Sequence, residues 1–107
     1  QIDHMIPFSV WRNNDLWNLL PAHSKINNDK RDSIPSPEML SEKKDLIIQY
    51  WKYIRSSDVY LFDKELNLNL IDKKFKPISN WEHQAFDALL KKCSYLIDIR
   101  GFEEFNL

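Results

Sequence analysis

Apolar and polar positions divide the chain into two unlike parts. Up to residue 32 the apolar residues occur in short runs separated by Asn, Asp and His. Such runs are too short for amphipathic helices and predict strand pieces around an Asn-rich loop at 12–15. These pieces are Ile2, Met5–Ile6, Leu16–Trp17 and Leu19–Leu20. Residues 22–32 contain no helix breaker and predict a short exposed helix with Ile26 as its apolar anchor.

Helical signals dominate after residue 36. Pro35 and Pro37 exclude a helix through that point and favour an extended segment. Ser36 followed by Pro37 and Glu38 is typical of a helix N-terminus, with Ser36 as the N-cap. Apolar residues then recur along one helical face: Leu40, Ile47, Trp51 and Ile54.

The last two segments differ in how clearly they predict a helix. Residues 66–70 alternate like a strand, yet 59–71 also fits helical spacing, and we favour a helix because no partner strand is apparent. Residues 79–82 form a capping box that predicts the start of a final helix. Gly101, the only glycine, marks its end. The expected class is therefore α+β: an irregular part at 1–36, followed by a mainly helical part at 37–107 that packs on it.

Composition limits the class of protein further. The chain has 107 residues, of which 43% are hydrophobic, which is typical of one folded domain. Lys+Arg 15 against Asp+Glu 16 leaves a net charge of −1, so no basic excess indicates a general polyanion binder. A single cysteine, Cys93, excludes an internal disulfide and a zinc site built from cysteines alone. No apolar run is long enough to span a membrane and no secretory leader is visible, which favours a cytoplasmic protein without a membrane partner.

The chain opens at Gln1, and residue types that carry chemistry begin two positions later. A domain rarely places its chemistry on a fraying terminus. We therefore expect a piece of a longer protein, in which upstream residues complete the first strand and upstream domains are partners.

The residue types of the first part favour a metal-centred site. Neighbours on a strand point to opposite faces, so Asp3 and His4 would serve different tasks. Asp3 and Asn27 offer the hard oxygen ligands that suit Mg²⁺ or Mn²⁺. A histidine such as His4 suits a general base. The amide oxygen of Asn18 can accept from an imidazole N–H and so fix the orientation of the ring.

The segment IDHMIPFSVWRNNDLWNLLPAHSKINNDKRDSIPS resembles the core of an HNH endonuclease, a ββα-metal nuclease. The family pattern is Asp-His, a central Asn before two apolar residues, and a final His or Asn. The signature positions here are His4, Asn18 and Asn27. The spacing is also similar to that of the HNH domain of CRISPR-associated RNA-guided nucleases, as are the trailing residues Lys30, Asp32 and Pro35.

This resemblance implies a metal-dependent endonuclease that hydrolyses phosphodiester bonds in DNA, with RNA as an alternative substrate. Asp3 and Asn27 would bind one divalent cation at the scissile phosphate. His4 would deprotonate the attacking water, and Asn18 would hold His4 in place. The biological setting that the resemblance suggests is bacterial defence or a mobile element.

Two further implications concern residues near Asn27. Lys30 and Arg31 occupy positions where family members place cations that contact phosphate. Many relatives carry cysteine pairs for structural zinc, whereas His23 and Ile26 stand at the corresponding positions here. No structural zinc is therefore expected.

Two other functions remain open at this point. One is a nucleic-acid-binding or interaction module that keeps the HNH fold without cutting. The other is a secreted nuclease toxin with a dedicated immunity protein. Several residues outside the pattern are interpreted as structural. Trp11 and Trp17 are expected to pack the loop, and Cys93 to be a small buried hydrophobe. His83 is expected at the surface, and the lysine pairs on solvated helix faces.

Overall fold

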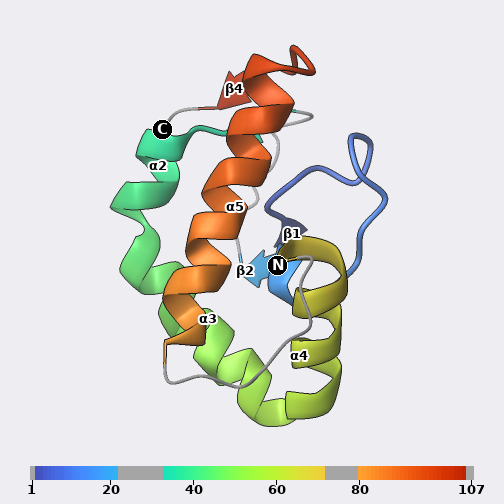
Figure 1. Ribbon diagram of the computed structural model, residues 1–107, viewed down its shortest axis with the longest axis vertical. Helices are drawn as coiled ribbons and strands as arrows, with labels where there is room; N and C mark the ends of the chain where they lie inside the picture. The colour runs from blue at the N-terminus through green and yellow to red at the C-terminus, as the bar shows by residue number, and fades with distance from the viewer. Residues whose placement is uncertain (1, 22–32, 72–79, 106–107) are drawn as a thin grey trace.

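The computed structural model describes residues 2–21, 33–71 and 80–105, and its fold is α+β with a helical C-terminal half, as predicted (Figure 1). Short strands and a 3₁₀ turn make up the first part. The helical half contains, in chain order, α2 (Pro37–Glu42), α3 (Lys44–Ser57), α4 (Val59–Leu66), the π-helix η2 (Asn67–Ile71) and α5 (Trp81–Asp98). No helix in the described ranges combines the length and the apolar character needed to cross a membrane.

Two antiparallel strands frame the first part. β1 (Ile2–His4) pairs with β2 (Leu19–Pro21), so that His4 lies opposite Leu19. The predicted strand piece at Leu16–Trp17 is wrong, because these residues form the 3₁₀ turn η1 (Leu16–Asn18) that leads into β2. The piece at Met5–Ile6 is also wrong: both residues are buried, but the chain bends away from the strand there. The predicted helix at 22–32 lies outside the described residues.

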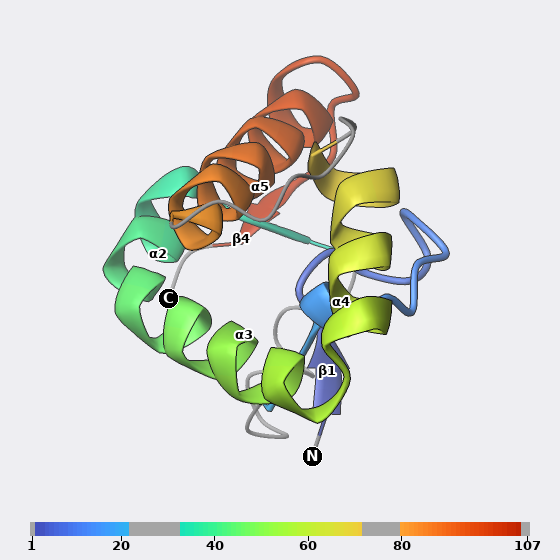
Figure 2. The same ribbon diagram turned by 60° about the horizontal axis from the view of Figure 1, so that its bottom comes forward.

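The helices surround one core. α2, α3 and α4 follow one another in an arc, and α5 lies across its open side (Figure 2). The predicted apolar face at 40–54 is buried or half-buried, yet it belongs to two helices, because the chain leaves helical geometry at Lys43 (φ −97°, ψ 7°). Fully buried residues from both parts meet in this core, among them Ile6, Trp17, Trp51, Phe62 and Leu89.

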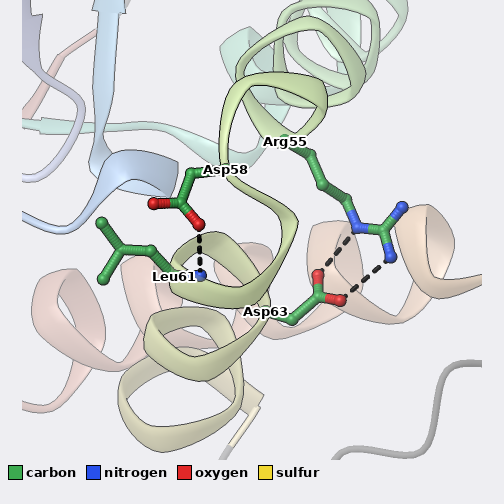
Figure 3. A network of polar contacts seen from close by, with 4 residues as sticks. All are labelled: Arg55, Asp58, Leu61 and Asp63. Atoms are coloured by element: carbon green, nitrogen blue, oxygen red, sulfur yellow. Dashed lines mark hydrogen bonds and ion pairs between the residues drawn. The ribbon is translucent and has the colours of Figure 1, made fainter.

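The corner between α3 and α4 is fixed by polar contacts (Figure 3). Arg55 makes a two-pronged ion pair with Asp63, with Nε–Oδ1 at 2.8 Å and Nη2–Oδ2 at 2.9 Å. Asp58 caps α4 by accepting from the main-chain N–H of Leu61 at 3.0 Å. Bidentate geometry makes such a pair directional. The helix favoured for 59–71 is confirmed, as α4 continues directly into η2.

The final helix is confirmed, but its predicted capping box is wrong in register. The N-cap residue is Asn80, whose side chain makes no capping hydrogen bond, and not Ser79. After α5 the chain closes back on the extended segment at Pro35, which forms an unpredicted parallel pair: β3 (Ile34–Pro35) beside β4 (Glu104–Phe105). The N–H of Ile34 donates to the carbonyl of Glu103 at 2.8 Å.

Gly101, predicted at the C-cap of the final helix, lies two residues after the C-cap Ile99, in the turn that follows α5, and it allows a direct stability test. Its φ of 74° lies in the left-handed region, and the N–H of Phe102 then donates to the carbonyl of Leu96 at 3.0 Å. An added Cβ would meet no atom within 4 Å, so the cost of a side chain is conformational and not steric. We expect Gly101→Ala to lower the free energy of unfolding by about 1–2 kcal/mol, measured by denaturant unfolding. Gly101→Asn should lose less, because Asn tolerates this conformation better; equal losses in both variants would contradict the explanation.

Candidate active site

His4 lies at the end of β1 and is half-buried. Its Nε2 lies 2.7 Å from Oδ1 of Asn14, and its ring is tilted against that of Phe8 with centroids 5.4 Å apart. A carbonyl oxygen only accepts, so this contact places the hydrogen of a neutral ring on Nε2. Asn14 was not predicted as a site residue, and the signal for it in the sequence is its place in the Asn-rich loop at 12–15.

Asn18 closes the loop that follows His4, here called the His4 loop (residues 5–15). Its side chain is fully buried and makes three hydrogen bonds. Oδ1 accepts from the N–H of Ile6 at 2.9 Å, and Nδ2 donates to the carbonyls of Ile6 at 3.2 Å and Asn13 at 3.1 Å. All three partners are main-chain groups of the loop. The sequence predicts that this amide binds the imidazole, whereas the residue described at Nε2 of His4 is Asn14.

Asp15 anchors the far end of the His4 loop. Its Oδ2 accepts from Nε1 of Trp17 at 2.9 Å and from Nδ2 of Asn69, in η2, at 2.7 Å. Its own N–H donates to Oδ1 of Asn13 at 2.8 Å. Burial of a carboxylate is costly without such donors. The loop is thus tied to the helical half at this point.

Glu65 of α4 makes a second hydrogen bond between the helical half and the first part of the chain. Its Oε1 accepts from the main-chain N–H of Leu16 at 3.0 Å. Burial raises the pKa of the Glu65 carboxyl above its ordinary value, and the nearby Asp15 carboxyl adds to the rise, while the hydrogen bond from Leu16 opposes it. A neutral Glu65 is favoured more in the folded chain than in the unfolded one.

Two tryptophans, Trp11 and Trp17, pack the loop against the core, as predicted from the sequence. Trp17 is fully buried, and Nε1 of Trp51 donates to its carbonyl at 2.9 Å. The ring of Trp11 packs 5.6 Å from that of Trp17, and Nζ of Lys92 lies 4.4 Å from the centre of the Trp11 ring. The structural interpretations of Cys93, which is buried, and of His83, which is exposed, are also confirmed.

The predicted metal ligands fall largely outside the described part of the chain. Asp3 follows Ile2 on β1 and lies opposite Leu20, but its side chain is not among those described. Asn27 lies outside the described residues, as do His23 and the predicted phosphate contacts Lys30 and Arg31. Within the described ranges no three His, Cys, Asp or Glu side chains gather into a metal-binding group.

A comparison with known protein families finds a match in the same part of the chain as the candidate site. A family model described as HNH endonuclease matches residues 1–36, about a third of the chain. The matched residues include β1, the His4 loop, η1 and β2, and the match supports a nuclease-type HNH domain that acts on nucleic acid. HNH nucleases generally use a divalent metal. No curated protein and no solved structure matches the chain.

Proposed function

We propose that this chain is a metal-dependent HNH endonuclease that hydrolyses phosphodiester bonds in DNA. The observation that carries the proposal is the oriented imidazole of His4. Its Nε2 is occupied by Asn14, and the loop that holds Asn14 is closed by the buried Asn18. These residues lie within the segment that matches the HNH family. A histidine used only for packing would not need its tautomer fixed by a loop built in this way.

His4 acts as general base in this proposal. Its Nδ1 takes a proton from water as the water oxygen forms a bond to the phosphorus of the scissile phosphate. The bond from phosphorus to the 3′ oxygen breaks, and the products are a 5′-phosphate and a 3′-hydroxyl once the leaving oxygen gains a proton from solvent. Asn14 orients the ring, and Asn18 holds the loop that carries Asn14.

The donor set fits a hard divalent cation. A carboxylate from Asp3 and an amide oxygen from Asn27 are ligands that Mg²⁺ and Mn²⁺ accept together with water and phosphate. Asp3 precedes His4 on β1, so its position along the strand is adjacent to that of the general base. When bound, the cation supplies charge stabilisation at the phosphate and at the leaving oxygen. Lys30 and Arg31 are proposed to contact neighbouring phosphates.

The two parts of the chain have separate roles in the proposal. Residues 1–36 form the HNH core and residues 37–107 form an extension that packs on it. The contacts of Trp51, Glu65 and Asn69 with the first part support this division. In the proposal the extension supplies the support that structural zinc gives in many relatives, because a single cysteine leaves no cysteine pairs for such a site.

Plasmid nicking tests the proposal. Supercoiled plasmid incubated with the full chain should be converted to nicked or linear forms with Mg²⁺ or Mn²⁺ and should stay intact with EDTA. Parallel incubation with a single-stranded RNA distinguishes the alternative substrate. Plasmid left intact with both metals, while a pull-down shows that the same chain retains DNA, would contradict cleavage and favour a binding module.

A further inference from the structure

We propose that Glu65 and Asn69 of the helical half are positioning residues for the imidazole of His4. The inference rests on the proposed function, since it assigns these residues to the same site. Both lie outside the segment that matches the HNH family. Neither touches substrate in the proposal, and both act through the His4 loop.

Two hydrogen bonds from the helical half reach the end of the loop, one at its last residue, Asp15, and one at the next residue, Leu16. Glu65 accepts from the N–H of Leu16 across 49 positions of sequence, at 3.0 Å. Asn69 donates to Oδ2 of Asp15 across 54 positions, at 2.7 Å. The two bonds therefore hold consecutive residues of the chain, Asp15 and Leu16. The His4 loop lies beside α4 in both views (Figures 1 and 2).

Asn14 connects these anchored residues to His4. Asn14, the partner of His4, lies directly between Asn13 and Asp15. The residue Asn14 is exposed, so burial does not fix it, whereas Asn13 and Asp15 are only 6% and 9% exposed. The position of Asn14 therefore depends on its two neighbours. Asn13 is held by Asn18 from within the HNH segment, and Asp15 is held from the helical half.

The geometry of η2 supports a specific role for Asn69. A π-helix places its residues differently from the α-helix that precedes it, and such segments often occur at functional sites. Asn69 is exposed overall, yet its amide reaches the buried carboxylate of Asp15. The same carboxylate oxygen accepts from Trp17, so loss of Asn69 would leave one of two donors.

Substitutions at these positions separate positioning from general stability. Glu65→Ala removes the acceptor for the N–H of Leu16. Glu65→Gln keeps an acceptor oxygen there, and it replaces the carboxyl group near Asp15 with a neutral amide. Asn69→Ala removes the donor to Asp15. Leu68→Ala, at a residue of η2 that is 60% exposed, is the matched control.

In the full chain we expect Glu65→Ala and Asn69→Ala each to lower kcat for plasmid cleavage by about 10–100-fold, the range seen for residues that orient a catalytic group. KM should be unchanged, because neither residue contacts DNA. Glu65→Gln and Leu68→Ala should keep wild-type kcat. Circular dichroism of each variant checks the fold. If Glu65→Ala does not fold, Asn69→Ala alone tests the positioning role, because Asn69 is exposed and its replacement should leave the fold intact.

A second readout does not depend on cleavage. The ¹⁵N chemical shifts of the imidazole report which nitrogen carries the hydrogen, and we expect the Nε2–H form of His4 in the wild type. Glu65→Ala and Asn69→Ala should shift the spectrum toward a mixture of tautomers. Folded variants with wild-type kcat and a wild-type His4 spectrum would overturn the positioning role. Should the wild type cleave no DNA, the proposed function fails, and the spectrum alone supports or overturns the inference.

Discussion

Replacing His4 with alanine is expected to lower the rate of DNA cleavage by about 10²–10⁴-fold, the contribution typical of a well-placed general base. The fold should remain intact. The imidazole is only half-buried, and its partner Asn14 and its ring neighbour Phe8 are both exposed. Removing it therefore leaves these two described neighbours accessible to water. Initial rates of plasmid nicking with Mg²⁺, together with thermal unfolding, measure the two effects.

The matched control for this substitution is His83→Ala. His83 is exposed in the first turn of α5 and is assigned no chemical role. It should leave both the nicking rate and the unfolding temperature unchanged. Nicking at the wild-type rate by His4→Ala would remove His4 from the mechanism. A parallel fall in unfolding temperature would show that the histidine acts through the fold.

Local patterns in the sequence predicted the helical character of the described C-terminal half, although not the break between α2 and α3 at Lys43. The apolar face of 40–54, the helical interpretation of 59–71 and the turn at Gly101 each depend on residues a few positions apart. The pair between β3 and β4 could not be found in this way, because its strands have two residues each and lie about 70 positions apart. The same limit applies to Glu65 and Asn69, whose partners are 49 and 54 positions away.

The candidate site shows a different limit. The order Asp-His, Asn, Asn predicts which residues matter, but it does not predict which atoms they bind. Asn18 has the same amide whether it holds an imidazole or a main chain, and only the turn of η1 places that amide inside the His4 loop. The contact described at Nε2 of His4 is with Asn14, one of several similar residues in a polar loop whose composition does not distinguish them.

Asn18→Ala carries the largest expected effect on stability. The substitution leaves the N–H of Ile6 and the carbonyls of Ile6 and Asn13 without their partner inside the core. Each unpaired buried group costs about 1–3 kcal/mol, so we expect a loss of about 3 kcal/mol or more in the free energy of unfolding. Domains of this kind have about 5–15 kcal/mol in total. Denaturant unfolding of the two chains measures the difference.

Asn14→Ala is the matched control, because it removes an asparagine from the same loop at an exposed position. Its unfolding should match that of the wild type. The comparison also separates two roles for Asn18. If its amide served chiefly to hold the imidazole, Asn18→Ala would lower kcat and leave stability unchanged. If it closes the His4 loop, stability falls first, and activity falls with it because Asn14 no longer lies where His4 needs it. Wild-type stability in Asn18→Ala would therefore contradict the loop-closing role drawn from its three main-chain contacts.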